Sequence, residues 1–200
     1  MVRAPLRMSM IHIQEFVQNH ARWIREKQSK IKSSPSPQRK QYISGETFLY
    51  LGQEYQLAVV EHQRHALTFM GSRFHLANSH IPKGKEAFVR WYKARALAVI
   101  SERVSFHANQ NHFKYQKIRI SSARTRWGSC SSNGTLSFTW RLVMASLEVI
   151  DYVVIHELVH TRIKNHSPKF WHLVADVLPE YKQYVFWLKK NGQFLTLGDD

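Results

Sequence analysis

The sequence predicts an α+β fold, because strand-type and helix-type patterns occupy separate parts of the chain. Apolar and polar residues alternate with a period of two between residues 47 and 77, as they do in half-buried strands. Apolar residues recur at helical spacing in residues 84–107 and again after residue 146. The 200 residues, 44% of them hydrophobic, are enough to build a substantial core. We expect one domain over residues 41–200, preceded by a basic helix and a linker in residues 1–40.

The N-terminal region of residues 1–40 combines a predicted helix with a predicted connector. Residues 9–31 are expected to form the helix, with Ser9 as its N-cap. The apolar positions at helical spacing are Ile13, Phe16, Val17, Ala21 and Ile24. Residues 32–41, KSSPSPQRKQ, contain the Ser, Pro and basic residues that are typical of a linker.

A β-rich part is expected over residues 43–80. Its four predicted strands are TFLYLG, EYQLAVV, HALTFM and RFHLAN. Turns are expected at Gly52-Gln53 and at Gly71-Ser72, because glycine tolerates the backbone conformations that tight hairpin turns need. A long amphipathic helix should follow over residues 84–107, with an apolar face that includes Phe88, Ala94, Leu97, Ala98 and Ile100.

The catalytic part is expected over residues 117–190. Two strands are predicted at residues 117–121 and 135–140, and the Asn133-Gly134 pair before the second is a strong turn signal. Ser146 is a suitable N-cap for the helix that comes next. This helix is apolar on nearly all sides, so it should run through the core, and two further amphipathic helices close the chain.

The central motif of the chain is His156-Glu157-Leu158-Val159-His160. Two histidines four residues apart lie on the same face of a helix, so both imidazoles can reach one metal ion. Glu157 points off the neighbouring face, close enough to take a proton from a metal-activated water. We therefore expect one catalytic zinc ion, with His156 and His160 as ligands and Glu157 as the general base.

A catalytic zinc ion needs a third protein ligand, and two residues are candidates. His166 could return to the metal if the chain reverses at Lys164-Asn165, since Asn tolerates a positive φ at a helix end. Ser167-Pro168 then has the form of an N-cap and first position of a new helix, which would fix His166 from both sides. Glu180 is the alternative ligand; we favour His166 because the local chain geometry explains how it reaches the metal.

Composition limits the compartment and the partners. Lys and Arg total 29 against 14 Asp and Glu, a net charge of +15, and residues 1–40 alone carry nine basic and two acidic residues. Such an excess is compatible with contact with nucleic acid or another polyanion, but no recognition motif accompanies it, and a soluble basic surface without a specific partner is the alternative. Neither a membrane span nor a signal peptide is expected. The single cysteine, Cys130, excludes an internal disulfide framework and favours a cytoplasmic location.

Several ordered motifs resemble the YgjP-like branch of the SprT-related zinc metallopeptidases. They are RTRWGSC (124–130), TLSFTWRLVMAS (135–146), VIDYVVIHELVH (149–160), NHSPKFW (165–171) and LPEY (178–181). Upstream, GETFLYLGQEYQL (45–57) resembles the N-terminal β region of that family. The resemblance implies a zincin-like core of the minigluzincin type, with His156, His160 and His166 as ligands and Glu157 as general base. Members are mostly described as metal-dependent hydrolases, so no substrate follows from the resemblance.

The function expected from these residues is zinc-dependent hydrolysis of peptide bonds. The strand at residues 135–140 is expected to offer an edge that holds an extended peptide. Cys130 is interpreted as a buried structural cysteine, and Arg124, Arg126 and Arg141 as solvated or structural arginines. Two alternatives stay open: a metal-binding module that contacts nucleic acid without proteolysis, and a metal-dependent hydrolase of a small amide.

Overall fold

A computed structural model describes residues 4–5, 8–25 and 39–198 of the chain. The chain divides into two compact units, residues 1–36 and 37–200, which are described separately. Most of the predicted linker and the last part of the predicted first helix lie outside the described residues. None of the helices described has both the length and the apolar composition to cross a membrane.

The N-terminal unit contains helix α1, Met10–Asn19. Ser9 is its N-cap, as predicted, and the Ser9 hydroxyl accepts a hydrogen bond from the backbone N–H of His12 at 3.4 Å. His20 forms a turn, and residues 21–25 are helical again. No residue of α1 is buried, and the Phe16 side chain is 62% exposed.

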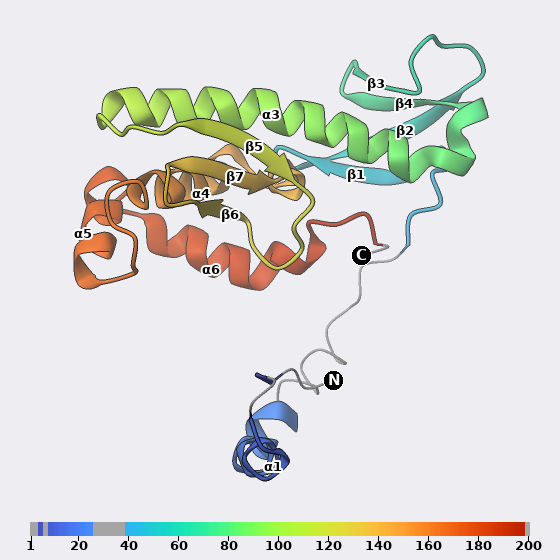
Figure 1. The fold of residues 1–200 in the computed structure, drawn as a ribbon. Coiled ribbons are helices and arrows are strands. Elements are labelled where there is room, and N and C mark those ends of the chain that lie inside the picture. The colour runs from blue at the N-terminus through green and yellow to red at the C-terminus, as the bar shows by residue number, and fades with distance from the viewer. Residues whose placement is uncertain (1–3, 6–7, 26–38, 199–200) are drawn as a thin grey trace. The chain divides into compact units, whose positions relative to one another are not determined.

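The second unit begins with a four-stranded sheet of order β1-β2-β4-β3 (Figure 1). The strands are β1 Thr47–Tyr50, β2 Gln53–Val60, β3 Leu67–Met70 and β4 Arg73–Ala77. Two antiparallel hairpins, β1-β2 and β3-β4, are joined by parallel pairing of β2 with β4. All four strands predicted for this region are confirmed.

Both hairpin turns use two residues with positive φ. Gly71 and Ser72 form the β3-β4 turn with φ of 57° and 61°, as predicted. The β1-β2 turn is formed by Leu51 and Gly52, with φ of 48° and 80°. The prediction of Gly52-Gln53 was therefore wrong by one residue, because Gln53 already pairs with the last residue of β1.

The β1-β2 turn packs against the residues that lead into the central helix. The backbone N–H groups of Leu51 and Gly52 donate to the carbonyl oxygens of Val143 and Met144, at 2.9 and 3.1 Å. A Cβ atom on Gly52 would lie 2.9 Å from Cβ of Ser146, so a side chain there would collide. Leu51 adopts the left-handed conformation, which is uncommon for a leucine, while its N–H is held by the Val143 carbonyl.

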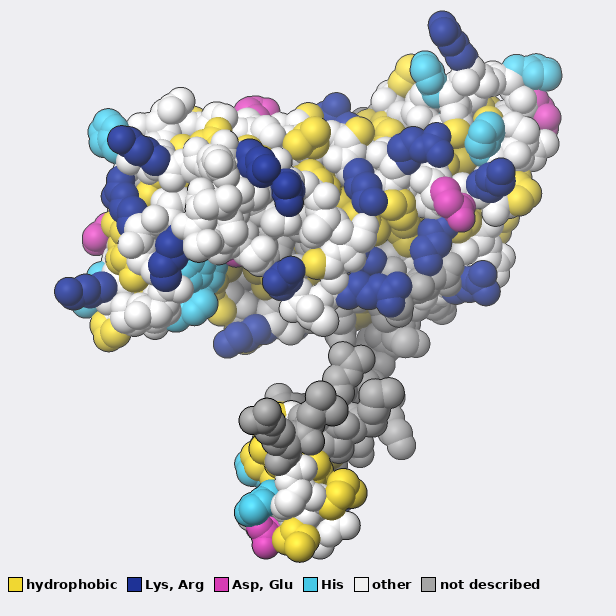
Figure 2. All heavy atoms as spheres, in the orientation of Figure 1, with side chains coloured by type: hydrophobic (Ala, Val, Ile, Leu, Met, Phe, Trp, Pro, Cys, Tyr) yellow, Lys and Arg dark blue, Asp and Glu magenta, His cyan; other side chains and the backbone are white. Residues whose placement is uncertain are grey.

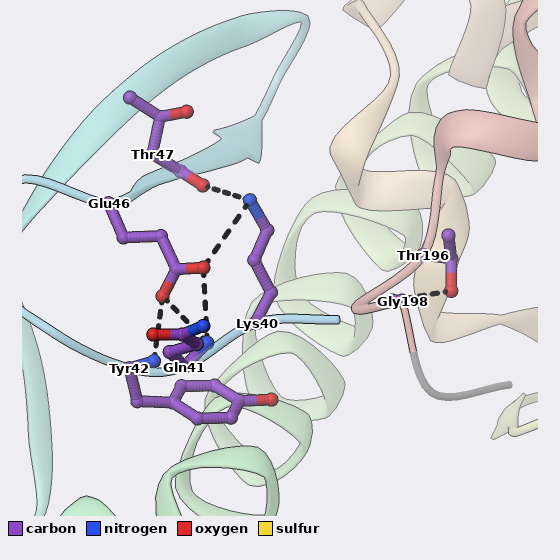
Figure 3. Close-up of polar contacts among 7 residues, drawn as sticks. All are labelled: Lys40, Gln41, Tyr42, Glu46, Thr47, Thr196 and Gly198. Atoms are coloured by element: carbon purple, nitrogen blue, oxygen red, sulfur yellow. Dashed lines mark hydrogen bonds and ion pairs between the residues drawn. The ribbon is translucent and has the colours of Figure 1, made fainter. Parts of the chain in front are cut away.

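The carboxylate of Glu46 orders the segment that precedes β1 (Figure 3). Its oxygens accept from the backbone N–H of Gln41 at 3.2 Å and from that of Tyr42 at 2.7 Å. The Lys40 ammonium lies 4.0 Å from Oε1 of the same carboxylate. The Tyr42 ring fills the space where Gly84 would carry a side chain, since a Cβ there would be 2.5 Å from Cγ of Tyr42. The segment is thereby fixed against the start of the next long helix.

That helix, α3, spans Gly84–Gln110 and follows the short 3₁₀ helix η1, Asn78–Lys83. Its existence over residues 84–107 is confirmed. Its buried residues are Gly84, Ala87, Phe88, Tyr92, Ala96, Val99, Ile100, Val104, His107 and Ala108. Ala94, Leu97 and Ala98, which were assigned to the apolar face, are exposed. The apolar face predicted from composition alone was therefore wider than the face of α3 that is buried.

The second sheet has three strands in the order β5-β7-β6. They are β5 Lys117–Ser121, β6 Gly128–Cys130 and β7 Thr135–Thr139, with β5 parallel and β6 antiparallel to β7. The three-residue strand β6 was not predicted. The expectation that residues 135–140 provide an edge is wrong, because β7 is the central strand and β6 and β5 are the edges.

The C-terminal helices enclose one central helix, α4, Leu147–Val159. It packs against α3, β6, α5 (Pro168–Val177) and α6 (Tyr181–Asn191). Two 3₁₀ helices complete the unit, η2 Trp140–Met144 before α4 and η3 Gly192–Phe194 after α6. In Figure 1, α3 is seen above the three-stranded sheet, next to β5, and α6 is seen below it. The predicted burial of α4 is confirmed, since nine of its residues are buried.

Asp151 connects α4 to α3 through a cluster of charges. Its two carboxylate oxygens accept from Nε and from one terminal nitrogen of Arg103, at 2.6 and 2.7 Å. Nε2 of His107 lies 3.1 Å from Oδ1, without the alignment of a hydrogen bond. Burial alone would raise the pKa of Asp151, but its contacts with His107 and Arg103 outweigh burial and lower that pKa. The carboxylate is therefore held in its ionised form between the two helices.

We predict that Asp151→Asn lowers the free energy of unfolding by about 1–3 kcal/mol at neutral pH, because Arg103 loses its bidentate acceptor. A lowered folded-state pKa contributes stability above the unfolded-state pKa of about 3.9, and this contribution is lost as pH falls through the folded pKa. The difference between wild type and variant should therefore shrink below about pH 4. Denaturant unfolding across pH measures it. Asp176→Asn, which changes an exposed carboxylate on α5, is the control; equal effects of both variants would contradict the prediction.

Candidate metal centre

Three histidine rings converge at the C-terminal end of α4. Nε2 of His166 lies 3.0 Å from Nε2 of His156 and 3.1 Å from Nε2 of His160. One donor atom from each residue lies within 4.8 Å of the other two. These spacings are close to the separation of two nitrogen ligands that are each about 2.0–2.1 Å from one zinc ion. Glu180 is not part of this group; it is exposed before α6 and accepts a hydrogen bond from Gln183 at 3.1 Å.

The chain between the second and third histidines turns without a positive φ. Helix α4 ends at Val159 with His160 as its C-cap, and the N–H of Ile163 donates to the Val159 carbonyl at 2.9 Å. Nδ1 of His160 lies 3.0 Å from the Ile163 carbonyl oxygen, which fixes the orientation of the ring. The chain bends at Asn165, as predicted, but Asn165 is not among the described residues with positive φ, so the left-handed conformation expected there is wrong. The side chain of Asn165 instead accepts from the N–H of Ser167 at 3.3 Å.

Helix α5 begins as predicted and supplies an aromatic wall to the three histidines. Ser167 is its N-cap residue and Pro168 its first residue, although the Ser167 hydroxyl makes no capping hydrogen bond. The fully buried Phe170 ring has its centroid 4.5–4.9 Å from those of all three imidazoles. The ring of Trp171 stacks on that of His166 at 5.7 Å. These contacts restrict the ring rotamers and exclude water from one side of the group.

Two of the three histidines, His156 and His160, are held neutral at neutral pH. Burial, followed by the charges that His160 and His166 can carry, lowers the pKa of His156 to about 3. Burial also lowers the pKa of His160. Neutral imidazole is the form that binds a metal ion. The three clustered imidazole nitrogens, which lie within 4.8 Å of one another, therefore fit a shared divalent cation.

Glu157 lies beside this group with an unsatisfied carboxylate. Its side chain is enclosed, with 5% of the residue exposed, and Oε2 has no hydrogen-bond partner among the described residues. Burial raises the pKa of Glu157 to about 8, although the positive charge of Arg126 acts to lower it. A cation held by the histidines would further favour the ionised carboxylate. A carboxylate with a pKa near neutrality is suited to accept and return a proton.

Gly128 at the start of β6 provides the space for the Glu157 side chain. A Cβ atom on Gly128 would lie 2.6 Å from both Cγ and Oε1 of Glu157. The φ of Gly128 is not positive, so the glycine is needed for this close approach and not for a turn. The sequence alone assigns no role to Gly128, because its contact with Glu157 joins residues 29 positions apart.

A hollow of about 280 Å³ opens over the histidines, and we call it the catalytic hollow. Its lining comprises Gly128, Ser129, Cys130, His156, Glu157, His160, Lys164 and His166. Cys130 is thus half-buried at the site and not a buried core residue as predicted. Burial raises the pKa of the Cys130 thiol, while the nearby Lys164 ammonium, 3.9 Å from Sγ, acts to lower it. A thiol with a raised pKa is a poor nucleophile, so Cys130 is not the reactive group.

The other sequence candidates have separate roles. Arg141 is buried, lies over the Trp140 ring and donates to the Ser122 carbonyl at 3.3 Å, so the structural interpretation of this arginine is supported. Arg126 acts electrostatically on Glu157, a role that sequence reasoning missed. The ring of Tyr152 lies 5.9 Å from that of His156, and burial raises the pKa of its phenol to about 12.

Comparison with known proteins gives one extensive match. The family model of the YgjP-like metallopeptidase domain matches residues 1–191. No curated protein sequence matches the chain significantly.

Solved structures add weaker similarities. The metallopeptidase zymogen abylysin of Pyrococcus abyssi is 21% identical, with 46% of this chain and 93% of that chain covered and a TM-score of 0.42. The zymogen jannalysin of Methanocaldococcus jannaschii is 23% identical, with 46% and 95% covered and a TM-score of 0.41. Wss1 of Saccharomyces cerevisiae is 16% identical, with 79% and 99% covered and a TM-score of 0.34. Because these TM-scores are below 0.5, the family assignment rests on the family model.

We predict that the purified protein carries about one zinc ion per chain and that His166→Ala loses it. Glu180→Ala should retain the metal, because its carboxylate is exposed and lies outside the histidine group. Elemental analysis of both variants measures this, with His172→Ala, an exposed histidine of α5, as the control. Retained zinc in His166→Ala together with loss in Glu180→Ala would reverse the choice of ligand.

Proposed function

The chain belongs to the YgjP-like metallopeptidase family, and we propose that it cleaves peptide bonds with Glu157 as general base. In this proposal His156, His160 and His166 hold one zinc ion. The observation that carries it is the buried, unpartnered carboxylate of Glu157 beside three imidazoles whose Nε2 atoms converge. An unsatisfied buried carboxylate is costly to folding, so its retention at this point favours a catalytic role.

The bound metal would supply Lewis acidity and a lowered pKa for the attacking water. Glu157 accepts the proton of that water and returns it to the nitrogen of the leaving amine. Its carboxylate lines the catalytic hollow and lies against the Gly128 backbone. The phenol of Tyr152, which lines a hollow beside His156 and Glu157 and is protonated at neutral pH as any tyrosine is, would be a hydrogen-bond donor for negative charge on the carbonyl oxygen.

Strand β6 is suited to hold the substrate as an extended chain. It is an edge strand of the three-stranded sheet, and its residues Gly128, Ser129 and Cys130 line the catalytic hollow. An extended peptide that pairs with such an edge gains backbone hydrogen bonds that do not depend on its side chains. This arrangement supports a protein or peptide substrate over a small amide.

Contact with nucleic acid stays a prediction from charge alone. Lys and Arg side chains are spread over the face seen in Figure 2 and do not form a single stripe. The net charge of +15 makes any binding to DNA or RNA steeply dependent on salt. None of the contacts in the described chain favours this function over proteolysis.

The catalytic proposal predicts that Glu157→Gln retains zinc and fold but loses hydrolysis by at least about a hundredfold. Glutamine keeps the size and hydrogen-bonding capacity of the side chain but cannot accept a proton at neutral pH. The measurement is cleavage of an unfolded protein by wild type and variant at matched zinc occupancy. Equal rates in the two proteins would exclude Glu157 as the general base.

A second prediction concerns Gly128, which we regard as a positioning residue. The methyl group in Gly128→Ala must displace the Glu157 carboxylate, since Cβ would lie 2.6 Å from Oε1. We expect kcat to fall at least about tenfold with zinc content unchanged, as a misplaced general base predicts. Ser137→Ala, in the neighbouring strand β7 and outside the lining of the catalytic hollow, is the control. Loss of zinc or of folding in Gly128→Ala would point instead to a structural role.

A further inference from the structure

A second hollow, which we call the apolar pocket, adjoins the catalytic hollow. It has a volume of about 340 Å³ and shares Gly128, His156 and Glu157 with the catalytic hollow. A peptide carbonyl placed at the histidines would therefore have a neighbouring side chain at the mouth of this pocket. The two hollows are therefore adjacent, with these three residues lining both.

The walls of the apolar pocket come from three elements. Trp127 precedes β6, Val153 belongs to α4, and Val185 and Leu188 belong to α6. The Trp127 ring is held in place by close packing, since a Cβ on Gly192 would lie 2.7 Å from its Cζ2 atom. The pocket is consequently formed by packed secondary structure, and a bound side chain would meet an aromatic and aliphatic surface.

The exposed charges that line the two hollows are positive. Lys189 of α6 lines the apolar pocket, and Lys164 lines the catalytic hollow. Among the described residues that line either hollow, Glu157 is the sole acidic one, and it is enclosed. An exposed ammonium beside an apolar surface fits a substrate that carries a carboxylate close to an apolar side chain.

We propose that the apolar pocket selects a large apolar or aromatic residue next to the cleaved bond, and that Lys189 binds a substrate carboxylate near that residue. This inference rests on the proposed peptidase function and names its substrate class. The carboxylate can belong to an Asp or Glu side chain or to the C-terminus of the peptide, because both offer the same acceptor to an ammonium.

The size of the pocket decides which side chains it accepts. A volume of about 340 Å³ is near the lower end of the roughly 300–1,000 Å³ range of ligand pockets, which suits a single side chain. Replacing Phe by Ala in the substrate leaves this apolar surface unfilled, and a single methylene is already worth about tenfold or more in specificity. Lys189 is exposed, so its ion pair should contribute less, about two- to fivefold.

The first experiment measures kcat/KM of the zinc-loaded protein on a set of fluorogenic peptides. The peptides differ by Phe, Leu, Ala or Gly beside the cleaved bond, and by Asp or Asn and C-terminal acid or amide nearby. We expect Phe or Leu to exceed Ala at least about tenfold. The Asp/Asn and acid/amide pairs identify the source of the carboxylate. Equal cleavage of all four apolar-series peptides would overturn the proposal.

Two variants test the residues themselves. Lys189→Glu should reduce kcat/KM for the carboxylate peptide about two- to fivefold relative to its uncharged counterpart. Lys190→Glu, the exposed neighbour that does not line the pocket, is the matched control. Val185→Phe fills the pocket and should abolish the preference for Phe over Ala. Equal behaviour of the two lysine variants would exclude the role of Lys189. If Val185→Phe misfolds, the peptide series measured with the wild type still tests whether the pocket selects an apolar residue.

A binding measurement separates this inference from the catalytic proposal. Zinc-loaded Glu157→Gln should bind the labelled Phe peptide more tightly than the Ala peptide in fluorescence anisotropy. Selective binding without cleavage by the wild type would overturn the peptidase function and leave the pocket assignment standing. Cleavage by the wild type, together with equal binding of the Phe and Ala peptides, would overturn the pocket assignment and leave the peptidase function standing.

Discussion

The burial of α4 is the constraint on which the rest of the catalytic unit depends. A helix that is apolar around almost its whole circumference must be covered on every side, and here α3, β6, α5 and α6 cover it. Polar side chains on the covered part of α4 are then enclosed with it, and each enclosed charge costs several kcal/mol unless it is paired. Asp151 is paired by Arg103 from α3. By contrast, Nδ1 of His156 and Oε2 of Glu157 are buried without a hydrogen-bond partner among the described residues.

Helix α3 determines how the two sheets are arranged around that core. Its first half packs on the aromatic residues of the four-stranded sheet, where the Tyr92 hydroxyl donates to the Leu49 carbonyl at 2.6 Å. Its second half carries Arg103, which bonds to Asp151. Its 27 residues correspond to a length of about 40 Å, so one rigid element connects both sheets. The four-stranded sheet therefore contributes no side chain to the catalytic hollow; it supports the opposite, N-terminal end of α4.

The sequence allowed local features to be predicted well and pairings between distant segments poorly. His156, Glu157 and His160 follow from helical spacing, and the start of α5 follows from Ser167-Pro168, because these signals lie within a few residues. Strand β6 was missed because three residues, one of them glycine, carry no alternation. The order β5-β7-β6 could not be predicted either, since no local pattern states which strand lies in the middle. Gly128 illustrates the same limit: its role depends on a helix that follows much later in the chain.

The two hairpin turns of the four-stranded sheet have the same local geometry but very different surroundings. The Leu51-Gly52 turn bonds to η2 and leaves no room for a side chain at Gly52, whereas a Cβ on Gly71 would meet no atom within 4 Å. Insertions are tolerated at turns whose backbone is free of such contacts. For protein engineering, the Gly71-Ser72 turn is thus the position for an affinity tag, a fluorophore or an inserted domain. The Leu51-Gly52 turn has the same length but is unsuitable. An insertion there would displace the residues that precede α4.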